Sequence, residues 1–499
     1  MSSLLRQASR HVTNQVSLKA LNAFITPPSV EGAFADELRE EKVSPGDEGL
    51  SQSPIKGKVI AVKDNISTAE QATSCASALL DCYSSPFPAT VVQRLKDAGA
   101  VVTGSTNMDE FGMGSDSMNS YFGPVKNAIS HDLSAGGSSG GSAVAVATGQ
   151  CHAALGTDTG GSVRLPAAYN GIIGFKPSYG MISRWGVVAY ANSLDTVGIL
   201  AKNTIEVGRV FAMARGYDSH DPTSLSEATR LMIEQKLGDH NSRKEARQTA
   251  LHFGVPEEYN VQELQPAVRD AWICTLQRLQ EAGHSVKPIS LPATKIALSA
   301  YYVLAPAEAS SNLAKYDGAR YGRKTNNSRN TGDVLYSTTR GQGFGEEVRR
   351  RVLLGAFSLS AGAIDNYFKQ AQKVRRLIQL DFNRAFLFQH PLMDSIDEGV
   401  SEADKVDFII SPTAQSTPPQ LSELQHMDHV SSYSADVLTV PASLAGLPAI
   451  SVPVSMVEEQ ASTGTESTPI GMQITGQYGT DSAVLSAAGM LESLFTKPR

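Results

Sequence analysis

Residues 155–180 read LGTDTGGSVRLPAAYNGIIGFKPSYG. The short apolar run from His152 to Leu155 leads into this stretch and predicts a strand, and Ser162 stands at the start of a predicted helix. Residues 171–175, Gly-Ile-Ile-Gly-Phe, predict a further strand. A strand, a glycine-rich turn, a helix and another strand in so short a span are typical of an α/β fold with a buried sheet.

The same alternation occurs earlier in the chain. Residues 58–62 and 100–104 are apolar runs that predict buried strands, and residues 90–98 and 141–148 predict helices. Further helices are expected over 264–282, where apolar residues share one face, and from 349 to about 388. We therefore predict one large α/β domain over residues 55–499, with a mixed, twisted central sheet flanked by helices.

Three polar stretches interrupt this pattern, at 216–249, 394–405 and 456–469, and we expect them to be mobile surface insertions. Residues 1–54 form a separate N-terminal region. It contains Arg6 and Arg10 and has no acidic residue before Glu31. An amphipathic, arginine-containing start without acids predicts a mitochondrial presequence and a location in the matrix. An ordinary N-terminal helix that caps the fold is the alternative.

Composition limits the class of protein. The chain has 499 residues, 41% of them hydrophobic, so a large core is feasible, and its formal net charge of −7 argues against charge-driven binding of nucleic acid over a broad surface. The four cysteines show no CxxC pair and no metal-ligand spacing, so we expect no metal site and a reducing compartment. No apolar run approaches 18 residues, so we expect no membrane span.

A second glycine- and serine-rich loop, GGSSGGS, covers residues 136–142. It lacks the spacing of both common phosphate-binding motifs, although a nest for another anion stays open. Residues 136–140 also satisfy the G-x-S-x-G pattern of α/β-hydrolases. That pattern requires a strand directly before the serine, and residues 131–135 are not strand-like.

The two loops and Lys63 together can attack an amide. The backbone N–H groups of residues 159–162 can converge on one oxyanion, and a helix N-terminus favours negative charge there. A serine needs a base, and Lys63 qualifies if burial keeps its amine neutral. Taken alone, Ser162 is also explained as a helix cap and Lys63 as a surface lysine.

GGSSGGSA at 136–143, the stretch at 155–180 and AVKDN at 61–65 resemble the amidase signature family. The resemblance implies that Lys63 is the base, that Ser138 is a relay serine preceded by a cis peptide bond, and that Ser162 is the acyl-forming nucleophile. Thr159, Gly160 and Gly161 would supply the oxyanion donors. Ser139 lies outside this set.

Within that family, MDEFGMGS at 108–115 and the segments 343–355 and 436–448 are similar to the A subunits of glutamyl-tRNA(Gln) amidotransferases. This resemblance implies a glutaminase. Arg351 would bind the carboxylate of glutamine, Asp436 its ammonium, and Tyr301 would line the site. A solvated helix arginine and a helix cap are the plainer explanations of Arg351 and Asp436.

The resemblance also implies partners. Ammonia would pass to the tRNA-binding B subunit of the amidotransferase, a small accessory subunit would join the complex, and tRNA(Gln) would be contacted only indirectly. ATP and magnesium would belong to the partner, and we expect no cofactor in this chain. A stand-alone amidase for simple or aryl amides is the alternative, and a non-catalytic scaffold is a third possibility.

Overall fold

The computed structural model describes residues 18–28, 53–245, 250–323, 336–393, 401–428, 432–461 and 464–496. The predicted presequence lies largely outside these ranges. The strands are β1 (Phe24–Thr26), β2 (Val59–Lys63), β3 (Val101–Thr106), β4 (Ala153–Asp158), β5 (Ile173–Lys176), β6 (Thr196–Ala201), β7 (His252–Pro256), β8 (Ser285–Ile289), β9 (Phe408–Pro412), β10 (Ala449–Ala461) and β11 (Gly464–Thr475).

The helices are α3 (Thr90–Asp97), α4 (Gly140–Ala147), α5 (Arg164–Tyr169), α6 (Thr204–Ala214), α7 (Glu227–Glu245), α8 (Pro266–Glu281), α9 (Ala297–Asn312), α10 (Ser337–Gly343), α11 (Glu346–Ser358), α12 (Phe368–Ala385), α13 (Leu421–His426), α15 (Val440–Leu444) and α16 (Asp481–Thr496). Short 3-10 turns connect several of them, among them η1 (Glu110–Gly112) and η6 (Ser434–Asp436).

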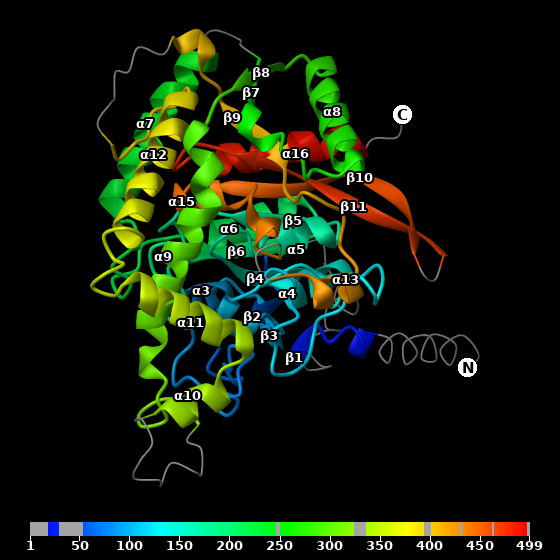
Figure 1. The fold of residues 1–499 in the computed structure, drawn as a ribbon. Helices are drawn as coiled ribbons and strands as arrows, with labels where there is room; N and C mark the ends of the chain where they lie inside the picture. Colours follow the sequence, from blue (N-terminus) through cyan, green and yellow to red (C-terminus); the bar gives the residue numbers. More distant parts are fainter. Residues whose placement is uncertain are drawn as a thin grey trace, which may run out of the picture.

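The strands form one sheet in the order β1-β3-β2-β4-β6-β5-β10-β11-β9-β7-β8, which runs from the bottom to the top of Figure 1. Strand β2 pairs in parallel with both β3 and β4, and β7 pairs in parallel with β8 and β9. The strands between them, from β4 to β9, pair antiparallel. The sheet is therefore mixed, as predicted.

Strand β2 shows how the sheet divides its two faces. Ile60 and Val62 join the large apolar cluster that contains side chains of α3, α6 and α16, whereas Val59 and Ala61 join a smaller one with α4 and α5. Side chains alternate between faces along a strand. Lys63 therefore points to the same face as Ala61, toward α4 and α5, where protein groups surround it.

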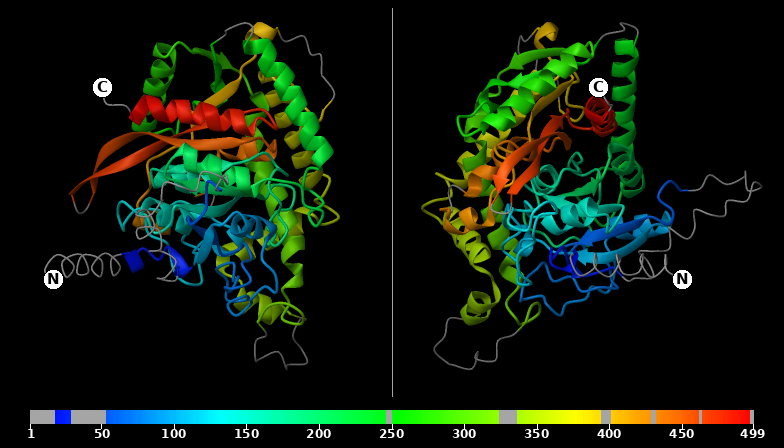
Figure 2. Two further views of the ribbon diagram at one scale, coloured as in Figure 1. Left: turned by 180° about the vertical axis from the view of Figure 1, so that it is seen from behind. Right: turned by 90° about the vertical axis from the view of Figure 1, so that its right-hand side faces the viewer.

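The helices form two layers. On one face α6 contacts both α3 and α16, and Figure 2 shows α16 in red. On the other side α9 packs against α11, α12 and the short α15, and Figure 1 shows the long helices α9 and α12 side by side. Helices α4 and α5 pack on the strands and on each other and are nearly wholly buried, so mainly small and apolar side chains fit there.

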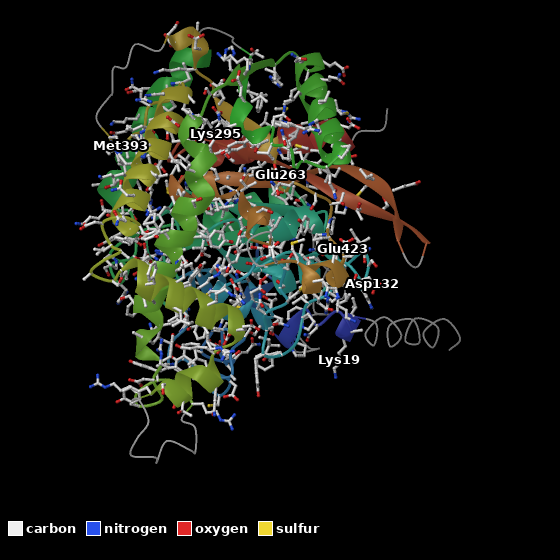
Figure 3. The ribbon with its side chains drawn as sticks, in the orientation of Figure 1. Lys19, Asp132, Glu263, Lys295, Met393 and Glu423 are labelled. Carbon is white, nitrogen blue, oxygen red and sulfur yellow. The ribbon has the colours of Figure 1, made fainter. Side chains whose placement is uncertain are left out.

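Short loops anchor the segment that leads into residues 136–142. Asp132 and Glu423 lie near one another in Figure 3, where α13 meets this segment. Leu421 N donates to Asp132 O at 2.8 Å, and Ser134 N donates to Pro419 O at 2.9 Å. Residues 131–135, all of them described, form isolated bridges but no strand, which agrees with rejecting the hydrolase elbow.

Two predictions of local structure differ from the fold. The helix expected from 349 to about 388 is two helices, α11 and α12, separated by turns around Gly362. The polar stretches at 216–249 and 456–469 contain α7 and the paired outer parts of β10 and β11. Residues 18–28, assigned with the N-terminal region, add β1 to the sheet. Residues 394–400 of the remaining stretch lie outside the described residues, and the mobility of all three stretches stays a prediction.

Candidate active site

Lys63 ends β2 and is fully buried. Its Nζ lies 2.7 Å from Ser138 Oγ, 2.8 Å from Ser139 Oγ and 3.0 Å from Thr157 Oγ1. The apolar run before Lys63 places the residue inside the sheet, and the alternation along the strand turns its side chain toward the loop that leads into α4. The structure thus brings the predicted base into direct contact with the predicted relay serine.

Burial decides the charge of this amine. It lowers the pKa of Lys63 from 10.5 to about 7, while the nearby carboxylates of Asp109, Asp158 and Asp195 act in the opposite direction. Loss of hydration disfavours the charged form, and here it outweighs the three acids. Lys63 is therefore poised to carry a neutral amine near neutral pH.

The peptide bond between Gly137 and Ser138 is cis, as the family resemblance implies. Ser138 O accepts a hydrogen bond from Asp109 N at 3.3 Å. Ser139, which directly precedes α4, donates through its hydroxyl to Thr157 O at 3.3 Å. Ser138 and Ser139 are both buried, so their hydroxyls face protein groups, with Lys63 at the centre.

Ser162 lies in the loop between β4 and α5 and is 8% exposed. Its carbonyl accepts from Ser139 N at 3.1 Å, which joins the two glycine-rich loops. Within the described ranges we find no hydrogen bond from Ser162 Oγ, and no acceptor for the backbone N–H groups of residues 159–162. Buried N–H groups without partners are costly, so this loop is prepared to bind an anionic oxygen.

A buried ion pair holds this loop from behind. Arg164 Nη2 lies 2.9 Å from Asp158 Oδ1, and Arg164 Nε lies 2.9 Å from Asp158 Oδ2. Arg164 also donates to Thr439 O at 2.9 Å and to Gln473 Oε1 at 2.6 Å. The guanidinium thus connects both ends of the nucleophile loop to the chain near η6 and to β11.

Arg351 points inward from α11 and is 3% exposed. Its Nε donates to Glu347 Oε1 at 2.7 Å and its Nη1 donates to Tyr190 Oη at 2.9 Å. The guanidinium carbon lies 5.2 Å from the ring centre of Tyr302. We find no partner for Nη2 in the described part of the chain, so this group retains N–H donors for an anion.

Asp436 lies at the end of η6 and is buried. Its Oδ2 accepts from Ser115 Oγ at 2.8 Å, and burial raises its pKa to about 6 although Ser115 and Arg351 lower it. Tyr301 approaches the nucleophile loop so closely that a Cβ on Gly160 would lie 2.8 Å from Tyr301 Cζ. A Cβ on Gly161 would lie 3.2 Å from Asp436 Oδ1.

The predicted residues therefore converge. Lys63 contacts Ser138, the backbone of Ser139 contacts that of Ser162, and Tyr301 and Asp436 adjoin Gly160 and Gly161. Arg351 reaches the same region through side chains that the sequence did not single out. The missed residues are Ser115, Thr157, Tyr190, Tyr302 and Glu347. Thr157 shares a loop with Ser162, Ser115 lies in the family-typical stretch 108–115, and Glu347 precedes Arg351 at helical spacing, whereas Tyr190 and Tyr302 carried no signal.

The structure reports on two other classes of site. Among the described residues, no group of three or more His, Cys, Asp or Glu side chains is placed to hold a metal ion. No helix in those ranges is both long and apolar enough to cross a membrane.

Similarity to known proteins extends over the same residues. The family model for Amidase matches residues 18–485. The protein named as the mitochondrial A subunit of glutamyl-tRNA(Gln) amidotransferase in Coccidioides posadasii (strain C735) is 54% identical over 504 residues, which covers 99% of each chain. The protein of the same name from Emericella nidulans is 53% identical and covers 98% of this chain and 99% of its own.

Solved structures agree. The crystal structure of the A subunit of glutamyl-tRNA(Gln) amidotransferase from Thermotoga maritima is 34% identical, with a TM-score of 0.68, and the match covers 94% of this chain and 88% of that one. A 6-aminohexanoate cyclic dimer hydrolase has a TM-score of 0.73 at 23% identity and shares the fold alone. The predicted α/β domain and the resemblance drawn from residues 61–65, 136–143 and 155–180 are confirmed, and the chain belongs to the Amidase family.

Proposed function

We propose that this chain is the glutaminase subunit of a mitochondrial glutamyl-tRNA(Gln) amidotransferase. The relatives that match it over almost its whole length carry that name and that location. One observation carries the chemistry: the buried Lys63 Nζ lies 2.7 Å from Ser138 Oγ, beside the loop that bears Ser162. A base, a relay hydroxyl and a nucleophile in one buried cluster are what acyl transfer from an amide requires.

Acylation begins with Ser162. Its Oγ attacks the side-chain amide carbon of glutamine while its proton moves to Ser138 Oγ, and the proton of Ser138 moves to neutral Lys63 Nζ. The N–H groups of Thr159, Gly160 and Gly161 hold the oxygen that becomes negative. They are arranged before the reaction, so little reorganisation is needed in the transition state.

The same groups then work in reverse. The protonated Lys63 returns its proton through Ser138 to the departing nitrogen, the C–N bond breaks, and ammonia leaves an acyl-Ser162 ester. A water molecule attacks this ester with Lys63 again as base, which releases glutamate and restores Ser162. Each proton taken in one half is returned in the other.

Selectivity for glutamine rests on its charged end. Arg351 has N–H donors left to bind the carboxylate, and Asp436 has a carboxylate oxygen directed toward Gly161 for the ammonium. Such charge-assisted hydrogen bonds are stronger than neutral ones. Tyr301 packs over Gly160 and limits the room between these charges and Ser162.

The remaining proposals concern the complex. The word "subunit" in the names of the relatives supports assembly with other chains. Ammonia would pass to a tRNA-binding B subunit, aided by a small accessory subunit, and the B subunit would use ATP and magnesium to activate glutamyl-tRNA(Gln). The glycine-rich loops of this chain lack the spacing of the common phosphate-binding motifs, and we propose no cofactor for it.

The test is mass spectrometry of the assembled enzyme after brief mixing with glutamine. A glutamyl adduct should appear on Ser162, and Ser162→Ala should abolish both the adduct and glutamine-dependent tRNA amidation. Ser493→Ala, at a serine in α16 outside the site, is the matched control. An adduct on another residue would overturn the assignment. Rapid turnover of simple amides that is indifferent to Arg351→Ala would favour the stand-alone amidase.

A further inference from the structure

The segment 109–115, DEFGMGS, contacts the proposed machinery at three separate points. In the sequence this segment only indicates the family, and no step of the proposed mechanism requires it. It follows β3, begins with Asp109 and continues through η1. Asp109 and Glu110 are both buried carboxylates, so their partners have to be protein groups.

The first contact is with the relay serine. Asp109 N donates to Ser138 O at 3.3 Å, and a Cβ on Gly112 would lie 3.7 Å from Ser138 Oγ. The carboxylate of Asp109 closes the segment on itself, because it accepts from Ser117 N at 2.9 Å and from Asn119 N at 3.0 Å. The segment is therefore held in one conformation against the catalytic loop.

The second contact is with helix α11. Glu110 Oε2 accepts from Gly345 N at 2.7 Å, and its other oxygen accepts from the Ser77 hydroxyl. Gly345 is the residue immediately before α11, where the helix dipole and this hydrogen bond favour a negative charge on Glu110, although burial raises its pKa to about 7. Next to it, the Phe111 and Phe344 rings meet edge to face with centroids 5.7 Å apart. Glu110 and Phe111 thus fix the start of the helix that carries Arg351.

The third contact is with Asp436, the proposed partner of the ammonium, which glutamine carries on the same carbon as its carboxylate. Ser115 Oγ donates to Asp436 Oδ2 at 2.8 Å. The bond occupies one carboxylate oxygen and leaves Oδ1 on the side of Gly161. Glu110 and Ser115 lie on one short segment, so the two proposed charge-binding groups are both positioned from it.

We propose that the segment 109–115 sets the selectivity for glutamine: Glu110 positions Arg351 for the carboxylate and Ser115 positions Asp436 for the ammonium. Both are positioning residues, because neither touches the substrate in this scheme. The inference rests on the proposed function. It adds the residues that fix the distance between the two charge-binding side chains, Arg351 and Asp436. Since the segment also contacts Ser138, that span is set relative to the reacting amide.

The test compares three substrates in the assembled enzyme. Glutamine has both charges, 4-aminobutanamide lacks the carboxylate and 4-carbamoylbutanoate lacks the ammonium. Glu110→Ala should lower kcat/KM for glutamine and for 4-carbamoylbutanoate by about tenfold, the effect of losing one hydrogen bond to a charged group, and spare 4-aminobutanamide. Ser115→Ala should lower kcat/KM for glutamine and for 4-aminobutanamide by about the same factor and leave kcat/KM for 4-carbamoylbutanoate unchanged.

Two further variants keep the test decisive. Glu110→Gln keeps an acceptor for Gly345 N and should restore most of the glutamine activity, even if Glu110→Ala does not fold. Ser178→Ala removes a similar buried hydrogen bond, from Ser178 Oγ to Asp481 Oδ2 at 2.7 Å. Any loss of kcat/KM that it causes should be the same for all three substrates. An equal loss on all three substrates in both segment variants would overturn the inference. A wild-type enzyme that does not distinguish the three substrates would instead overturn the proposed function.

Discussion

The rate of acylation should depend on pH through Lys63, because only the neutral amine accepts a proton. Burial lowers the pKa of this residue from 10.5 to about 7. At pH 7 about half of the molecules then carry a neutral Lys63, against about one in 3,000 for a pKa of 10.5. The difference, 10.5 − 7, corresponds to about 5 kcal/mol at 1.36 kcal/mol for each tenfold change.

A change of pH from 8 to 6 tests this dependence. Over this range the neutral fraction falls about tenfold. With glutamine, the acylation rate should fall more steeply below pH 6. Burial raises the pKa of Asp436 to about 6, so below that pH its carboxyl is neutral and no longer attracts the ammonium. 4-Carbamoylbutanoate has no ammonium, so its profile should follow Lys63 alone.

The assay is rapid mixing followed by quantification of acyl-enzyme by mass spectrometry, from pH 5.5 to 8.5, with both substrates. Thermal unfolding at each pH checks that the fold persists. The expected result is one ionisation near pH 7 for 4-carbamoylbutanoate and an added loss for glutamine at the acidic end. An acylation rate that does not change with pH, or one that still rises tenfold per pH unit at pH 8.5, would show that a neutral Lys63 with a pKa near 7 is not the base.

Four substitutions test the geometry further. Lys63→Met should raise the free energy of unfolding at pH 7, by at most about 5 kcal/mol, because it removes the cost of burying an amine; a lower Tm than that of the wild type would contradict this. Arg164→Met should lower the free energy of unfolding by about 3–5 kcal/mol in urea titrations, since it leaves Asp158 buried without the guanidinium at 2.9 Å. A loss below about 1 kcal/mol would show that Asp158 is neutral or that Val163 N and Ser443 Oγ, at 3.3 and 3.4 Å, are sufficient partners. Gly160→Ala should lower kcat/KM for glutamine because its Cβ would lie 2.8 Å from Tyr301 Cζ. Gly208→Ala, where nothing lies within 4 Å, should leave kcat/KM unchanged and stabilise α6 by about 1 kcal/mol.

Local sequence predicts the elements that hold the chemistry. Strands β2, β4 and β5 are short apolar runs bounded by glycine or polar residues, so their pattern alone identifies them. The apolar run before Lys63 makes a partly buried position foreseeable, but its full burial depends on the loop at 136–142, which lies 75 positions away at Ser138. Helix α4 follows from its run of small side chains.

Contacts between distant segments could not be predicted in this way. Ser115 and Asp436 are 321 positions apart, and nothing in either neighbourhood indicates the other. The ion pair of Arg351 with Glu347 has helical spacing, yet its burial depends on how α11 packs on α9. The polar ends of β10 and β11 suggested an insertion because a two-stranded ribbon that extends beyond the sheet, as in Figure 1, has no apolar face to reveal it.

The acids around Lys63 pose the remaining question, because three carboxylates should favour a charged amine. Each of them is already engaged: Asp158 by Arg164, Asp195 by Thr159 Oγ1 at 2.7 Å and by two backbone N–H groups, and Asp109 by the N–H groups of residues 117 and 119. Arg164 offsets the charge of Asp158, and burial raises the pKa of Asp109 and raises that of Asp195 to about 6. Burial therefore favours the neutral forms of Lys63 and of two of its three acidic neighbours. The close packing that fixes the catalytic loops is thus also what lets Lys63 act as a base.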